Sequence, residues 1–388
     1  MNTKSVMESR ISPSVEYVTG VIAARITSGE YPAGRWLPAE REIAEEFHVS
    51  RNVVKSVVRE LQARSLVHCS SRCRTVVAGL PDRTTATRLS KAGPRRHTLG
   101  LWIWPMTDYP STAAIVNGIN RTLNHDEFRL MVTGATARSW AEAAKSESTF
   151  LMRMADDEDL SGLILWCIGG SQSLPALQAL RRRQIPLVFI DRRPPQEFTA
   201  DYVGVDNEWA AFELTTHLIA QGHRTIAHVS NLDGASTVAE RMSGYRLALK
   251  QAGIREDPDL IKHLEDPSSD EDTECKHLLA GLPTGDRAPT AIFAVSDHAA
   301  LRIMNALRAS NVRVGYDIAV AGFDGIERWR TGARTLTTAC QPFEKIGIQA
   351  LRLLMKRIEN PVGATCTDIV LEAPIEVSSS TKPEVVPV

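Results

Sequence analysis

The chain has 388 residues, of which 43% are hydrophobic and 23% are charged. This length exceeds that of one ordinary domain, so we expect two or three. No apolar run approaches the roughly 20 residues of a membrane span, and the first residues lack the apolar core of a signal peptide. The six cysteines are mostly scattered, which favours a reducing compartment over a disulfide framework or a zinc site. These features predict a cytoplasmic multidomain protein.

Charge is unevenly distributed along the chain. The net charge of −1 conceals 16 Lys and Arg against 9 Asp and Glu in residues 1–97. Residues 98–388 hold the remaining 29 basic against 37 acidic side chains. A small basic domain joined to a larger acidic one is typical of a nucleic-acid-binding protein with a separate second module.

The first eighty residues contain three helical patterns followed by a hairpin-like segment. The helical patterns cover residues 13–29, 37–47 and 49–61, and the second has Pro38 at its first helical position. Two short apolar runs around a basic tip then predict a β-hairpin at residues 66–78. The short turn before the third helix gives helix-turn-helix spacing, in which the second helix of the pair enters the major groove.

The third helical pattern, VSRNVVKSVVREL at residues 49–61, has two different faces. Its apolar face has the helical spacing i, i+3, i+4 and i+7 and consists of Val54, Val57, Val58 and Leu61. Its basic face carries Arg51, Lys55 and Arg59. Ser50 is a candidate N-cap. A basic stripe alone is most often a solvated surface, but the excess of positive charge around it favours a negatively charged partner.

The segment GEYPAGRWLPAEREIAEEFHVSRNVVKSVVREL resembles the winged-helix domain of GntR-type transcription regulators, over about residues 14–78. The resemblance implies DNA contacts by Arg41, Ser50, Arg51, Asn52 and Lys55. Arg51 is best placed for a base edge, Ser50 for phosphate, and Arg41 and Lys55 for either. In the expected wing, Arg72 and Arg74 are candidates for the minor groove. The family's glycines are missing there and at Ser65.

Residues 80–97 are polar and basic without periodicity, which predicts a linker. From residue 98, continuous apolar runs alternate with helical patterns. Eight strands are predicted near residues 98–105, 128–132, 162–166, 186–190, 202–205, 225–230, 290–295 and 317–322. Such alternation is typical of an α/β fold with parallel sheets covered on both faces. We expect two doubly wound lobes that bind a ligand at the carboxyl ends of their strands.

The blocks VGVDN, GHRTIAHVS, ERMSGYRLALKQAGI, PTAIFAVSDHAAL and DIAVAGFDG resemble the LacI-type effector domain, which is similar to periplasmic sugar-binding proteins. The resemblance implies two lobes joined by three chain crossings, with a small molecule between them. A GntR-type domain joined to a LacI-type domain resembles the bacterial arabinose repressors. The predicted domains are therefore 1–79 (winged helix), 80–97 (linker) and 98–388 (effector binding and dimerisation).

Several polar residues are candidates for the effector site because they follow strands or match ligand-contacting positions of the LacI type. They are Ser111, Trp166, Asp191, Arg192, Asp206, Arg241, Asp297 and Asp324. Three of them have a competing structural explanation: an N-cap for Asp297, a surface salt bridge for Arg241 and a hinge role for Asp206. The carboxylates and arginines favour a monosaccharide or a sugar acid.

The sequence thus predicts a transcriptional regulator that acts as a repressor and has no cofactor. A homodimer would bind a pseudo-palindromic operator on double-stranded DNA, and effector binding would change its affinity. Whether the effector induces or co-represses stays open. An enzyme is disfavoured because the sequence contains no GxGxxG, P-loop, GxSxG or HExxH motif. The alternatives are a cytosolic sugar-binding protein and a regulator that responds to a nucleoside or a sugar acid.

Overall fold

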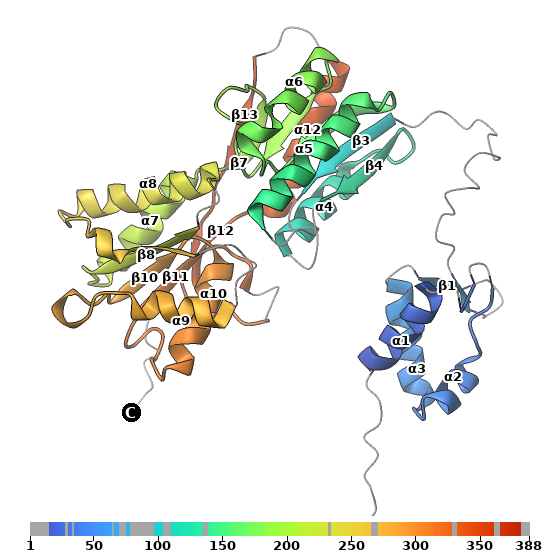
Figure 1. The fold of residues 1–388 in the computed structure, drawn as a ribbon, viewed down its shortest axis with the longest axis horizontal. Helices are drawn as coiled ribbons and strands as arrows, with labels where there is room; N and C mark the ends of the chain where they lie inside the picture. Colours follow the sequence, from blue (N-terminus) through green and yellow to red (C-terminus); the bar gives the residue numbers. More distant parts are fainter. Residues whose placement is uncertain are drawn as a thin grey trace, which may run out of the picture. The chain divides into compact units, whose positions relative to one another are not determined.

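A computed structural model describes residues 15–27, 30–32, 35–63, 66–69, 75–77, 97–103, 110–134, 139–231, 234–264, 271–327, 332–360 and 365–381. The chain divides into two compact units, residues 1–93 and 94–388, which we call the head and the body (Figure 1). Among the described helices, none is both long enough and apolar enough to cross a bilayer.

The head is a three-helix unit with a small hairpin. Its elements are α1 (Val15–Thr27), α2 (Glu40–Glu46), α3 (Arg51–Ala63), β1 (Val67–Cys69) and β2 (Thr75–Val77). The two strands pair antiparallel, and Trp36 forms an isolated bridge to Val76. The predicted winged-helix architecture of the head is therefore confirmed.

The predicted apolar stripes form the core of the head. Its buried residues include Val18 and Ile22 from α1 and Val54 and Leu61 from α3, all of them 0% exposed. One boundary differs from the prediction, because α2 begins at Glu40 and Pro38 lies two residues before it. The Glu42 carboxylate accepts a hydrogen bond from the backbone N–H of Ala39 (2.9 Å), and this contact starts the helix.

The first lobe of the body is a six-stranded parallel sheet with the order β13-β7-β6-β5-β3-β4. Its strands are β3 (His97–Trp102), β4 (Phe128–Thr133), β5 (Leu160–Leu165), β6 (Leu187–Ile190), β7 (Asp201–Val205) and β13 (Asp368–Leu371). Its helices are α4 (Pro110–Thr122), α5 (Trp140–Asp156), α6 (Leu174–Arg182) and α12 (Phe343–Glu359). Two apolar clusters cover the two faces of the sheet.

The second lobe has the order β14-β12-β11-β10-β8-β9, in which only the short β14 pairs antiparallel. Its strands are β8 (Ile226–Asn231), β9 (Ile261–Leu264), β10 (Ala291–Ala294), β11 (Ala319–Asp324), β12 (Thr337–Cys340) and β14 (Ile375–Glu376). Its helices are α7 (Asn207–Ala220), α8 (Ser236–Gln251), α9 (Glu271–Ala280) and α10 (Asp297–Ala309).

The chain passes between the lobes three times, as the LacI-type resemblance implied. The crossings run from β7 to α7, from β12 to α12 and from β13 to β14. All eight predicted strands are present, but β9, β12, β13 and β14 were not predicted. β13 illustrates the reason, because its residues alternate between exposed and half-buried and so lack the continuous apolar run of a central strand.

Helices α4 and α12 cross at two glycines. A Cβ atom added to Gly118 would lie 2.2 Å from the carbonyl oxygen of Glu344, and one added to Gly347 would lie 2.2 Å from that of Ile115. Since no real Cβ tolerates such distances, the two backbones approach each other only because both positions are glycine. This crossing fixes α12, which begins directly after the chain enters the first lobe.

We predict that Gly118→Ala destabilises the body by about 1–3 kcal/mol, because the added methyl group must push two helix backbones apart. Thermal unfolding of the full chain measures the effect. The control is Gly281→Ala, where an added Cβ would lie at an ordinary 3.4 Å from its nearest neighbour. An equal melting temperature for both variants would contradict the backbone contact.

Candidate DNA-binding surface and effector site

The third helix of the head presents its basic face to solvent. Arg51, Asn52 and Lys55 are exposed, while Val54 and Val57 of the same helix are buried. Ser50 caps the helix, since the backbone N–H of Val53 donates to its Oγ (3.4 Å). The helix therefore begins at Arg51, and its N-terminal side chains are accessible to a partner in a groove.

The turn before α3 adopts a left-handed conformation. His48 has a φ of 52°, and the backbone N–H of Val49 returns to the carbonyl oxygen of Ala44 (3.0 Å). On α2, Arg41 lies 3.6 Å from Glu45, and both side chains are 70% exposed. Such an exposed pair is weak, so Arg41 can exchange it for a phosphate.

Three head residues named in the sequence analysis, Ser65, Arg72 and Arg74, lie outside the described residues.

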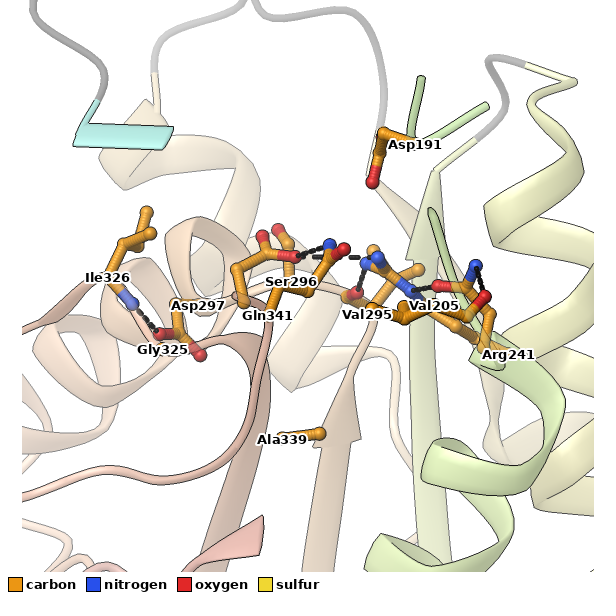
Figure 2. Close-up of polar contacts among 12 residues, drawn as sticks. Asp191, Val205, Arg241, Val295, Ser296, Asp297, Gly325, Ile326, Ala339 and Gln341 are labelled. Atoms are coloured by element: carbon orange, nitrogen blue, oxygen red, sulfur yellow. Dashed lines mark hydrogen bonds and ion pairs between the residues drawn. The ribbon is translucent and has the colours of Figure 1, made fainter. Parts of the chain in front are cut away.

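In the body, four polar side chains meet at the carboxyl ends of strands where the lobes face each other. Asp191 follows β6 of the first lobe, whereas Arg241 from α8 and Gln341 after β12 come from the other side (Figure 2). Asp324 lies at the end of β11 in the second lobe. Asp324 Oδ1 lies 3.4 Å from Arg241 Nη2 and accepts a hydrogen bond from Gln341 Nε2 (3.0 Å). The side chain of Asp191 points toward this row.

Both carboxylates in this group sit on unusual backbone. Asp191 has a φ of 60° and Asp324 has a φ of 119°. Residues other than glycine rarely adopt these positive φ values. The hydroxyl of Tyr202 donates to the carbonyl oxygen of Asp191 (2.9 Å) and holds this conformation. Strained residues of this kind cluster at ligand-binding sites, and this observation is independent of the polar contacts.

Arg241 is a buried, rigidly held cation. Its side chain is 6% exposed, its Nε donates to Asn207 Oδ1 (3.0 Å), and its Nη1 donates to the carbonyl oxygen of Val295 (2.7 Å). The guanidinium carbon lies 3.7 Å from the ring centre of Phe323. The alternative of a surface salt bridge for Arg241 is therefore wrong, because its pair with Asp324 is buried.

Asp297 has a different role from the two predicted for it. The N-cap of α10 is Ser296, whose Oγ accepts from the backbone N–H of Ala299 (3.3 Å). Asp297 is 0% exposed, and its two oxygens accept hydrogen bonds from the N–H of Ile326 and the Oγ1 of Thr338, each at 2.6 Å. It thus holds the segment that follows Asp324. Burial, together with the charge of Asp324, raises the pKa of Asp297 to about 7.

The remaining candidates surround the group or lie apart from it. Ser111, at the start of α4, is buried and lines a groove of about 1240 Å³ together with Gln341. Arg192 is half-buried, 5.3 Å from the ring centre of Trp140. Asp206 is exposed, lies where the chain crosses from β7 to α7, and caps α7 by accepting from the N–H of Trp209 (2.9 Å).

Buried polar atoms without a partner mark the places where a ligand would bond. Within the described part of the chain, no hydrogen bond reaches Oδ1 of Asp191, Oε1 of Gln341 or Nε1 of Trp166. Buried groups are normally satisfied, so the acceptors of Asp191 and Gln341 in this group favour a polar ligand. Gln341 was missing from the sequence candidates. The signal for it was its place directly after β12, a strand that the apolar pattern did not reveal.

The electrostatics of the group are dominated by its carboxylates. Burial raises the pKa of Asp324 to about 6, Arg241 and Gln341 oppose this increase, and the charge of Asp191 adds to it. Among the described residues, no group of three or more His, Cys, Asp or Glu side chains is arranged to hold a metal ion. The group thus offers carboxylate, amide and guanidinium atoms for hydrogen bonding.

Comparison with known proteins agrees with both halves of this description. Residues 15–77 match the model of bacterial regulatory proteins of the gntR family, and residues 215–380 match a periplasmic binding protein-like domain. The arabinose metabolism transcriptional repressor of Geobacillus stearothermophilus is 27% identical over 381 residues, which cover 97% of this chain and 100% of the relative.

Two solved structures share the fold. A LacI family transcriptional regulator from Enterococcus faecium with bound ribose has a TM-score of 0.60 at 24% identity. The match covers 74% of this chain and 99% of that structure's chain. A complex of the regulator CelR with cellobiose has a TM-score of 0.60 at 23% identity, with coverages of 95% and 99%. The chain is therefore a DNA-binding transcriptional regulator with a gntR-type head and a periplasmic-binding-protein-like body, homologous to the arabinose metabolism transcriptional repressor.

Proposed function

We propose that the regulator binds a neutral, polyhydroxylated sugar between the two lobes of its body and that this binding changes its affinity for DNA. The observation that carries the proposal is the pair of buried acceptors without partners, Asp191 Oδ1 and Gln341 Oε1, beside the buried Arg241–Asp324 pair. Sugar hydroxyls supply donors to the acceptors and lone pairs to the guanidinium and to the indole N–H of Trp166.

A neutral sugar suits the site better than a sugar acid. Two carboxylates, Asp191 and Asp324, face the ligand position, and the buried guanidinium of Arg241 is already paired with Asp324. An acidic ligand would add a third negative charge to a site shielded from water, where like charges repel strongly. The arabinose repressor among the relatives and the ribose and cellobiose complexes among the structures agree with a neutral sugar.

On the DNA side, we propose that the N-terminal end of α3 enters the major groove. Arg51 would contact a base edge, Ser50 a phosphate, and Arg41, Asn52 and Lys55 either kind of group. A homodimer formed through the bodies would present two heads to a pseudo-palindromic operator. Linkage makes the effect reciprocal, so a sugar that weakens operator binding must itself bind the DNA complex more weakly.

The proposal is tested by thermal shift of the full chain with neutral monosaccharides, sugar acids and nucleosides. A sugar that binds only the native state raises its melting temperature, because its binding free energy adds to stability. We expect a neutral sugar such as L-arabinose or D-ribose to stabilise the body and sugar acids to leave it unchanged. Stabilisation by a sugar acid or a nucleoside alone would contradict the proposal.

Arg51→Ala is expected to cost roughly 1–3 kcal/mol of operator binding and to relax base preference at one position of each half-site. Binding curves on single-base operator variants measure both quantities. Arg59→Ala serves as the matched change on the same helix, two turns farther from its N-terminus. Base preferences that change no more in Arg51→Ala than in Arg59→Ala would remove Arg51 from the reading position.

Asp324→Asn should abolish the response to the sugar and leave operator affinity in the absence of sugar unchanged. The physical reason is that the amide cannot pair with the Arg241 guanidinium or accept at both of its terminal atoms. Calorimetric titration and operator binding separate the two effects. Asp317→Asn, which alters an exposed pair with Arg313 in the same lobe, is the control. Loss of operator binding without sugar in Asp324→Asn would indicate misfolding instead.

Sugar affinity should fall as the pH is lowered through about 6, the pKa of Asp324. The ionised form of this carboxyl pairs with Arg241 and accepts hydrogen bonds, so protonation removes the binding-competent state. Titrations between pH 5 and 8 measure the dissociation constant (roughly tenfold weaker per unit well below the pKa). A profile that is flat in the unmodified chain would exclude Asp324 as an acceptor for the sugar.

A further inference from the structure

Arg193 joins the two lobes at the edge of the effector site. It belongs to the first lobe, two residues after Asp191, yet its backbone N–H donates to Ser236 Oγ (2.9 Å) and its Nε to Glu240 Oε1 (3.2 Å), both on α8 of the second lobe. On its own side, Arg193 Nη1 donates to Asp368 of β13 (2.6 Å). One residue thus holds the strand-end segment of Asp191 against a helix of the opposite lobe.

The bond to Glu240 continues to the effector-site arginine. Glu240 Oε2 accepts from Asn207 Nδ2 (2.9 Å), and Asn207 Oδ1 accepts from Nε of Arg241 (3.0 Å). Asn207 is 1% exposed, so its amide is held in place with both ends bonded. A continuous series of hydrogen bonds therefore links Arg193 to the guanidinium of Arg241 through the side chains of Glu240 and Asn207.

Close packing of α7 and α8 brings together the side chains that form this series of hydrogen bonds. A Cβ atom at Gly244, one turn after Glu240 and Arg241, would lie 2.1 Å from the carbonyl oxygen of Glu208. The glycine lets the start of α7 approach α8, and this places Asn207 between the two side chains it bonds. The relay is therefore built into the helix pair and is not a chance meeting of long surface side chains.

The same segment is also tied to the other cleft carboxylate. Arg193 lies over the ring of Tyr202, with its guanidinium carbon 4.3 Å from the ring centre. The Tyr202 hydroxyl donates to the carbonyl oxygen of Asp191. A shift of Arg193 relative to α8 consequently moves Asp191 on one side of the ligand position and Arg241 on the other.

The geometry points to the pair Arg193–Glu240 as an inter-lobe latch that positions Asp191 and Arg241 together and so couples effector binding to the angle between the lobes. Neither latch residue needs to touch the effector. The inference rests on the effector site proposed above, and it assigns to this second group of residues the transmission of binding to lobe movement. At 39% and 25% exposure, the two side chains remain able to separate when the lobes move.

The first test uses the full chain without sugar. Hydrogen exchange should be faster by roughly 3- to 30-fold in residues 191–198 and 236–241 of Glu240→Gln and Arg193→Gln, the range expected when a contact between coupled residues is lost. The control is Arg246→Gln. Arg246 lies on the same helix as Glu240, and the change removes its two-bond ion pair with Glu256 without touching the first lobe. Exchange in these segments that matches the control would overturn the latch.

The second test measures the dissociation constants of L-arabinose and D-ribose by calorimetry for the same variants and for the double variant. A latch predicts a weakening of roughly 3- to 30-fold in each single variant and no further loss in the double, with partial recovery in Arg193→Lys. Additive losses would overturn it. If neither sugar binds the unmodified chain, the proposed effector class fails, while the exchange measurement still decides whether the latch exists.

Discussion

The proposed effector site of the body is built around the ion pair of Arg241 with Asp324, which lies where the strands of the second lobe end. Removing two charges from water is costly, and their attraction offsets the cost only when the remaining donors and acceptors are bonded as well. Asn207, Val295 and Gln341 supply those bonds. An ion pair of this kind contributes little net stability, so its presence in the interior is better explained by recognition of a ligand than by folding.

Other features around the pair are also unfavourable for the empty protein. Asp191 and Asp324 hold left-handed backbone conformations, and acceptors on Asp191 and Gln341 are buried without donors. Each costs free energy that the well-packed sheets of the two lobes must offset. The sugar proposed as effector would relieve part of this cost by supplying donors, and the relief would require both lobes, because Asp191 belongs to one and Asp324 to the other.

Asp297 shows how a residue can matter to the site without offering atoms to a ligand. Both of its oxygens are bonded to the chain, at Ile326 and Thr338, and they fix the segment directly after Asp324. In the same way, the hydrogen bonds that link Arg193 to Arg241 would act on the site without contact between Arg193 and the ligand. Recognition of the effector thus depends on a ring of supporting contacts wider than the residues that face the sugar.

The sequence by itself determined the local patterns: the apolar stripe of α3, its exposed basic face, the central strands of both lobes and the division of charge between head and body. These follow from burial, which repeats with the period of the helix or strand and can be read within a short window. Chain order alone also placed Asp191 and Asp324 at strand ends.

Tertiary structure decided which of these polar residues meet and what each does. Gln341 bonds a residue 17 positions away, Asp297 one 41 positions away and Arg193 one 175 positions away, and no local pattern encodes such pairs. The short strands β9 and β13 were missed for a related reason, since they form by pairing with a neighbour and not by burying a continuous apolar run. The physical cause is the same in each case, because these contacts form only when the sheets assemble from segments that are distant along the chain.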